Sequence, residues 1–105
     1  MKTLAKIAMA LGFIAFPVSA FAGCAGYQSS PSSHHADVKF ENRTKGKVNV
    51  IWYKFNGGTR KYRTLAPTQS YRQGTYTNHV WEFTDAKGKC ISTLVVKNSQ
   101  TFAIQ

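Results

Sequence analysis

Short runs of β-branched and aromatic residues, separated by turn-forming residues, fill the chain from residue 38 to its end. Val48–Phe55 (VNVIWYKF) is the richest run, and Val80–Thr84 (VWEFT) alternates apolar and polar residues with the period of a half-buried strand. The strands expected on this basis are Val38–Asn42, Val48–Phe55, Arg60–Leu65, Gln69–Arg72, Val80–Thr84, Cys90–Val96 and Gln100–Ile104. About seven strands at this spacing, without a convincing helix, predict an all-β fold, an antiparallel sandwich or barrel.

Turn-forming residues separate these runs. Asn56-Gly57-Gly58 accepts positive φ at little cost, and Ala66-Pro67 ends the third run. Asp85-Ala86-Lys87-Gly88 supplies the turn after the fifth run. Gly74 is expected to break or bulge the fourth run before Tyr76, because glycine weakens the interior of a strand.

The first segment has the pattern of a secretory signal rather than of a folded domain. Lys2 and Lys6 give it a positive start, an apolar run over Ile7–Phe16 follows, and small residues end it before Cys24. The apolar run is shorter than the roughly 20 residues that span a bilayer as a helix. We therefore predict a signal peptide over residues 1–23 and an exported protein.

Two interpretations of the cleavage site remain open. Phe21-Ala22-Gly23-Cys24 is similar to a bacterial lipobox, which predicts lipidation of Cys24 and a membrane-anchored lipoprotein facing the periplasm or cell surface. In this interpretation residues 24–36 form a flexible, Ser-rich tether and residues 37–105 form the domain. Alternatively, ordinary signal peptidase cleaves after Ala20-Phe21-Ala22, and a soluble periplasmic or secreted protein results. The rival to lipidation at Cys24 is a disulfide with Cys90, which an oxidising compartment allows.

The charge balance is strongly basic and limits the possible functions. Fourteen Lys and Arg face four Asp and Glu, and removing Lys2 and Lys6 from the net charge of +10 leaves +8. Such a field attracts anions, here lipid headgroups or envelope polysaccharides, whereas no motif predicts nucleic-acid binding. No Cys or His spacing predicts a metal site, and no carboxylate pair or nucleophile motif predicts catalysis. We therefore expect neither a cofactor nor an enzyme.

One stretch carries a resemblance to a known family. Trp52 precedes Phe55 and Gly57, and Tyr62 precedes the run Thr64-Leu65-Ala66-Pro67. Further along, TYTNHVW (residues 75–81) has the form hydroxyl–Tyr–x–x–His–x–Trp. Over residues 42–85 these residues match, without a gap, the β domain of the von Hippel-Lindau tumour suppressor family, and the stretch closely resembles it.

The resemblance implies a seven-stranded sandwich that binds a peptide through one hydroxylated proline. Transferred residue by residue, the pocket consists of Trp52, Tyr62, Thr75, His79 and Trp81. The indoles would hold the flat ring, and Thr75 and His79 would pair its hydroxyl group. Thr75 replaces a family serine and keeps the hydroxyl.

The sequence also departs from the family pattern. An α domain that recruits elongin and a ubiquitin ligase follows the family's β domain, but this sequence ends at Gln105, so neither partner is expected. Tyr71 replaces a basic residue, and Arg60, Lys61, Arg63 and Arg72 cluster near the predicted pocket. Two functions therefore compete. One is an exported binding module for a proline- or hydroxyproline-like ring of a peptide. The other is a basic envelope-associated structural lipoprotein that holds anionic polymer or membrane.

Overall fold

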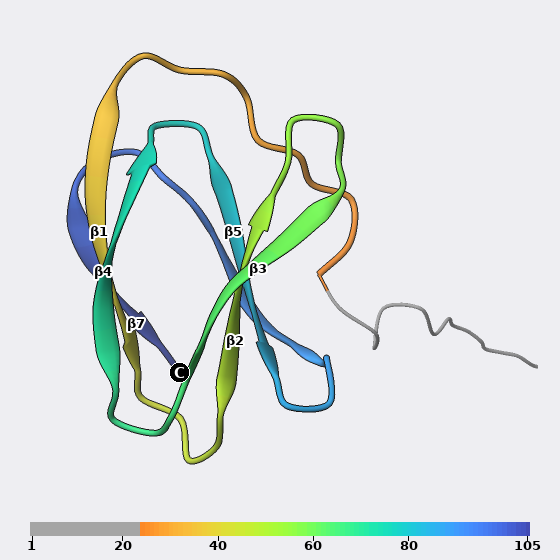
Figure 1. Cartoon of the computed structure of the whole chain (residues 1–105), viewed down its shortest axis with the longest axis vertical. Coiled ribbons are helices and arrows are strands. Elements are labelled where there is room, and N and C mark those ends of the chain that lie inside the picture. Colours follow the sequence, from red (N-terminus) through yellow and green to blue (C-terminus); the bar gives the residue numbers. More distant parts are fainter. Residues whose placement is uncertain (1–23) are drawn as a thin grey trace, which may run out of the picture.

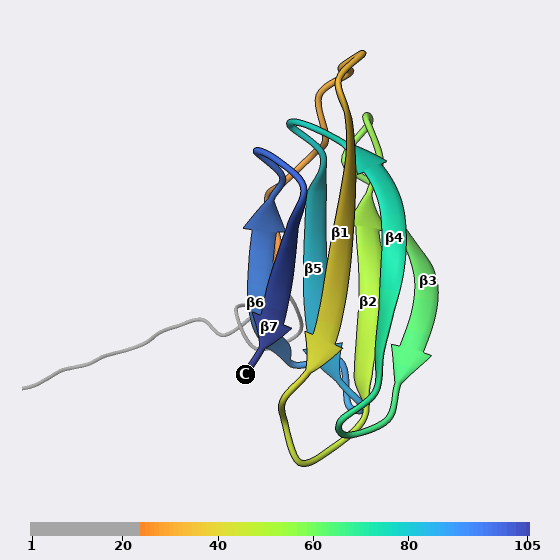
Figure 2. The same ribbon diagram turned by 90° about the vertical axis from the view of Figure 1, so that its left-hand side faces the viewer.

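The computed structural model describes residues 24–105, and the signal peptide predicted over residues 1–23 lies outside them. Its strands are β1 (His35–Asn42), β2 (Val48–Tyr53), β3 (Thr59–Leu65), β4 (Ser70–Tyr76), β5 (Val80–Asp85), β6 (Cys90–Val95) and β7 (Gln100–Ile104). They form one sheet in the order β4-β1-β7 and a second in the order β3-β2-β5-β6, stacked as a sandwich (Figures 1 and 2). The predicted all-β sandwich of seven strands is confirmed. No helix among the described residues is long and apolar enough to cross a membrane.

The alternating pattern of the strands builds the core between the sheets. In β1, Ala36, Val38 and Phe40 are buried, whereas residues between them are more exposed. Phe40 lies against Phe83 and Trp81 of the other sheet, with ring centroids 5.0 and 5.5 Å apart. Burying each large apolar side chain contributes about 1.5–3 kcal/mol. The buried cluster comprises Ala36, Val38, Phe40, Val48, Val50, Leu65, Trp81, Phe83, Val96 and Ile104.

Two details of the strand arrangement differ from the sequence-based prediction. Strand β4 continues through Gly74 to Tyr76, so the predicted break at Gly74 is wrong. The reason is that β1 begins at His35, earlier than predicted, and Asp37 pairs with Gly74 in an unbroken ladder. In addition, β1 and β7 pair in parallel, whereas the other neighbouring strands are antiparallel.

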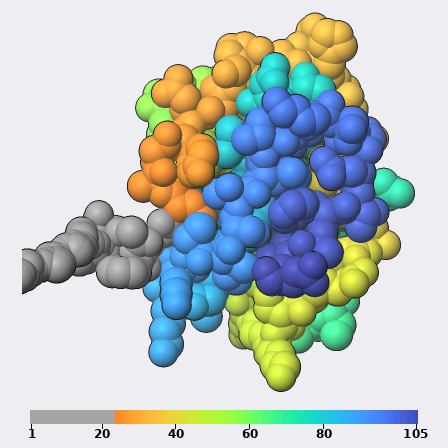
Figure 3. Space-filling view, turned by 180° about the vertical axis from the view of Figure 1, so that it is seen from behind, coloured from red at the N-terminus to blue at the C-terminus, as the bar shows by residue number. Residues whose placement is uncertain are grey.

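Residues 24–34 pack on the domain, so the predicted flexible tether over residues 24–36 is wrong. Ser29 is only 1% exposed. Its hydroxyl donates a hydrogen bond to the Tyr53 carbonyl at 2.6 Å and accepts one from the Val80 amide at 2.8 Å. This segment therefore joins the end of β2 to the start of β5, and Figure 3 shows it lying against the body of the domain.

The start of this segment is fixed covalently. Cys24 forms a disulfide with Cys90 at the start of β6, and the two Cα atoms are 5.1 Å apart. A thioether-linked lipid would require the same Cys24 sulfur atom. The structure therefore supports the disulfide alternative and contradicts the predicted lipidation of Cys24.

Candidate functional site

A pocket of about 240 Å³ lies at one end of the sandwich, where β2 and β4 end and β5 begins. The structure brings together all five residues predicted to form the site. The residues that line the pocket are Trp52, Phe55, Tyr62, Gly74, Thr75, Tyr76, His79 and Trp81. The site therefore joins residues from four strands (β2, β3, β4 and β5) and two connecting segments of both sheets, although it lies within a short part of the sequence.

The pocket has a buried base and a half-exposed aromatic rim. Trp81, Thr75 and His79 are 2, 3 and 8% exposed and form the base. Phe55, Tyr62 and Tyr76 are among the most exposed large hydrophobic side chains among the described residues. Exposed aromatic rings around a concave site favour contact with an apolar or ring-shaped ligand.

A chain of hydrogen bonds fixes the base of the pocket. The Trp81 indole N–H donates to Thr75 Oγ1 at 3.0 Å, and the Trp52 indole N–H donates to His79 Nδ1 at 3.2 Å. Thr75 Oγ1 and His79 Nδ1 are 3.5 Å apart. Since Nδ1 accepts from Trp52, neutral His79 carries its proton on Nε2, which is a donor. In the contact with His79 the Thr75 hydroxyl is then the donor, and its oxygen, which already accepts from Trp81, keeps a second lone pair that can accept. The base thus offers a ligand hydroxyl both a donor and a group that can accept.

The β4–β5 turn places His79 in this network. Asn78 has a φ of 69°, a left-handed conformation that asparagine tolerates better than most residues. The His79 amide donates to the Tyr76 carbonyl at 3.2 Å, and the His79 carbonyl accepts from the Val96 amide at 2.9 Å. The Asn78 amide donates to the Val96 carbonyl at 2.8 Å. Because the backbone is held on both sides, the imidazole has a fixed position.

Three residues of the pocket were not predicted. Phe55 lies in the β2–β3 connection, and its ring packs edge-on against Trp52 and His79, with centroids 5.4 and 5.3 Å apart. Tyr76 lies 5.4 Å from His79 by the same measure. Gly74 also lines the pocket, and a Cβ at this position would lie 3.4 Å from His35 Nε2 and 3.9 Å from Asp37 Oδ1 of the neighbouring strand β1. All three residues lie within the matched stretch of residues 42–85, but no motif assigned them to the pocket.

Burial lowers the pKa of His79 below the ordinary value of 6.5. In the unfolded chain the imidazole takes up a proton near that value, whereas the folded protein resists it. We therefore expect the free energy of unfolding to fall as the pH falls from 7.5 through 6.5 to 5. Urea unfolding at these pH values checks this. A His79→Gln variant should lose this dependence, whereas a His34→Gln/His35→Gln control should keep it. An unchanged pH dependence in His79→Gln would contradict the assignment.

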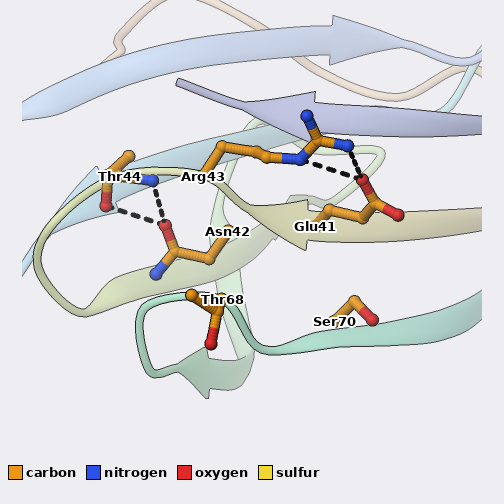
Figure 4. Close-up of a pocket in the computed structure, with 6 residues that line it drawn as sticks. All are labelled: Glu41, Asn42, Arg43, Thr44, Thr68 and Ser70. Atoms are coloured by element: carbon orange, nitrogen blue, oxygen red, sulfur yellow. Dashed lines mark hydrogen bonds and ion pairs between the residues drawn. The ribbon is translucent and has the colours of Figure 1, made fainter.

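A second hollow of about 530 Å³ lies at the opposite end of the sandwich (Figure 4). Its polar groups bind one another. Asn42 Oδ1 accepts from the Thr44 amide and hydroxyl at 2.9 and 2.7 Å, and Arg43 pairs with Glu41 at 2.7 Å. Asn42 also donates to the carbonyls of Gly46 and Leu65. The polar groups of this hollow therefore stabilise the β1–β2 connection, although the hollow is larger than the pocket at the other end.

Metal ligands do not gather anywhere in residues 24–105, where no group of three or more His, Cys, Asp or Glu side chains could hold an ion. Within the pocket itself, His79 is the one side chain of these four types. Its Nδ1 already accepts from Trp52.

Comparison with known families agrees with this geometry. The family model of the VHL beta domain matches residues 27–105, a range that contains every residue lining the pocket. The match begins at residue 27, within the segment that carries Ser29, so the family model includes most of this segment. VHL beta domains are substrate-binding modules, consistent with a site built for binding. With its two-sheet architecture and this match over most of its length, the chain belongs to the VHL beta domain family.

Proposed function

We propose that this protein is an exported, non-enzymatic binding module that holds the hydroxyproline ring of a peptide in the pocket of Trp52, Tyr62, Thr75, His79 and Trp81. The VHL beta domain family binds hydroxyproline-containing peptides. The observation that carries the proposal for this chain is the Thr75–His79 pair, 3.5 Å apart at the base of an aromatic pocket.

The chemistry of the pocket suits such a ring. Aromatic faces provide apolar contact for a pyrrolidine ring. Its hydroxyl group would be costly to bury unpaired, by about 1–3 kcal/mol, so it needs partners inside the pocket. The Nε2–H of His79 donates to the hydroxyl oxygen, and Thr75 Oγ1 accepts its hydrogen. An unmodified proline leaves both protein groups unpaired, which gives selectivity.

The peptide backbone also has a place to bind. Strand β4 is the edge of its sheet, because its one neighbour there is β1. Alternate backbone N–H and C=O groups of an edge strand remain available for an added strand. An extended peptide beside β4 would pass the pocket, to which Gly74, Thr75 and Tyr76 of β4 contribute. Main-chain pairing would supply affinity, and the pocket would supply specificity.

Two further features support export and a binding role. A Cys24–Cys90 disulfide persists in an oxidising compartment, such as the periplasm or the extracellular space. The signal-like pattern of residues 1–23 agrees with this destination. We propose a soluble periplasmic or secreted protein. The proposed non-enzymatic role is supported by the site chemistry, since His79 Nδ1 is engaged by Trp52 and the residues that line the pocket include no Asp, Glu, Lys or Arg.

Calorimetric titration with two peptides that differ only in one hydroxyl group tests the proposal. We expect a peptide with trans-4-hydroxyproline to bind at least about tenfold more tightly than its proline counterpart. Thr75→Val should remove this preference and Thr75→Ser should keep it, because serine retains the hydroxyl oxygen. Equal affinity of the wild-type protein for both peptides, or binding of neither, would rule the proposal out.

A further inference from the structure

Strand β3 carries a basic face beside the pocket. It is the edge of its sheet, with β2 as its one neighbour, and six of its seven residues are exposed (Figure 2). Three of these are cations, Arg60, Lys61 and Arg63. Among residues 24–105 the ion pairs are His35–Asp37, Lys39–Glu41 and Arg43–Glu41, and none includes a β3 cation. The positive charge of β3 is therefore not neutralised by described carboxylates of the chain.

A β-bulge directs two of these cations toward the pocket side. Val50 pairs with Arg63 and Ile51 with Lys61, so Tyr62 is an extra residue in β3. Paired residues project from the same face of a sheet. Arg60 therefore projects from the face of the pocket residue Trp52, and Arg63 from the face of the buried Val50. Lys61 pairs with Ile51, which alternates with the buried Val50 and therefore projects from the outer face.

Aromatic rings hold both arginines in place. The Arg60 guanidinium carbon lies 5.1 Å from the centroid of the Tyr62 ring, and that of Arg63 lies 4.3 Å from the centroid of Tyr71. Tyr62 itself lines the pocket, and its ring centroid is 5.1 Å from that of Trp81. A guanidinium that stacks on a ring uses its flat face and keeps the N–H groups of its edge for a carboxylate. We call Arg60 and Arg63 the arginine pair.

We infer that the arginine pair binds acidic side chains next to the ring residue, so that the partner is an acidic hydroxyproline-containing peptide. This inference rests on the proposed function, since the pocket fixes the position of the peptide. The argument for it is charge complementarity. The guanidinium groups of the arginine pair form no ion pair with a described carboxylate, and they lie beside one wall of the pocket. An anionic polymer or membrane needs no such register with the pocket and would respond to all the cations of the surface.

The test compares four peptides that contain either hydroxyproline or proline at the centre and either Glu or Gln at the two positions on each side. Titration uses the full chain at roughly 50 mM and 500 mM salt. We expect the Glu-flanked hydroxyproline peptide to bind roughly fivefold to tenfold more tightly than the Gln-flanked one at low salt, and the difference to shrink at high salt.

Two charge-matched variants locate the effect. Arg60→Gln/Arg63→Gln should abolish the preference for Glu over Gln and leave binding of the Gln-flanked hydroxyproline peptide nearly unchanged. Lys61→Gln/Lys45→Gln removes the same charge, from the outer face of β3 and from the β1–β2 connection, and should keep the preference. Equal losses in both variants would mean a non-specific field and would overturn the inference.

The remaining outcomes separate the two proposals. A preference for hydroxyproline over proline without any preference for Glu overturns the inference and leaves the proposed function intact. Binding of none of the four peptides overturns both. Binding of the wild-type protein and both variants to vesicles that contain an anionic phospholipid is measured as well. If Arg60→Gln/Arg63→Gln alone reduces vesicle binding and no peptide prefers Glu, the arginine pair contacts lipid and the inference is wrong.

Discussion

Removing the Cys24–Cys90 disulfide should lower the free energy of unfolding by about 4 kcal/mol. The bond joins residues 66 positions apart in the sequence, and a cross-link over so long a loop removes much conformational freedom from the unfolded chain. A small domain has a modest core, so this loss is a large part of a total stability of about 5–15 kcal/mol. Urea unfolding of a Cys24→Ser/Cys90→Ser variant, followed by tryptophan fluorescence, measures it.

The reducing agent dithiothreitol supplies the control for this prediction. It should destabilise the wild-type protein to the level of the double variant and should have no effect on the variant itself. The loss should also free residues 24–34, because the disulfide holds the start of the segment that carries Ser29. Faster hydrogen exchange at the Val80 amide, which donates to Ser29, would report this. Equal stability of the oxidised protein and the variant would contradict the prediction.

Replacing Thr75 by valine should cost about 1–3 kcal/mol of stability even without a ligand. Valine has nearly the same shape but no hydroxyl, so the buried Trp81 indole N–H loses its acceptor at 3.0 Å. An unpaired buried donor costs more than the average hydrogen bond contributes. Urea unfolding measures the change, and the same substitution removes one partner of the proposed ligand hydroxyl.

Two variants frame the result for Thr75. Thr75→Ser keeps the oxygen and should lose well under half as much stability as Thr75→Val, whereas Thr101→Val changes an exposed threonine of β7 and should be nearly neutral. If Thr75→Val were as stable as Thr75→Ser, Thr75 Oγ1 would not be the acceptor that holds Trp81. The hydrogen bond that joins the buried Trp81 to the pocket residue Thr75 would then be wrong.

The location of the site was largely predictable from the sequence, whereas its extent was not. The matched stretch contains Trp52, Tyr62, Thr75, His79 and Trp81, and the structure places all five around one pocket. Phe55, Gly74 and Tyr76 escaped prediction because no motif in the sequence marks them as pocket residues. The role of Gly74 depends on the continuation of β4 beside β1, and that pairing is decided by residues far away in the sequence.

The predictions for residues 24–36 failed for a related physical reason. A Ser-rich, polar composition is typical of a flexible tether, because such residues bury little apolar surface. Here Ser29 is ordered by backbone groups of Tyr53 and Val80, and these become neighbours only when β2 and β5 pair. The choice between a lipid and a disulfide at Cys24 likewise depends on where Cys90 lies in space.

The sequence by itself determined the fold class, because period-two alternation and turn residues are local properties that fix strands and their buried faces. It also determined the chemistry of the site, since the side chains that carry it are present in one matched stretch. Only the tertiary structure decided which strands are edges, that Arg60 and Arg63 share the face of the pocket, and that Cys24 meets Cys90. These features depend on strand pairing and a bulge, which arise from contacts between distant residues and leave no mark on local composition.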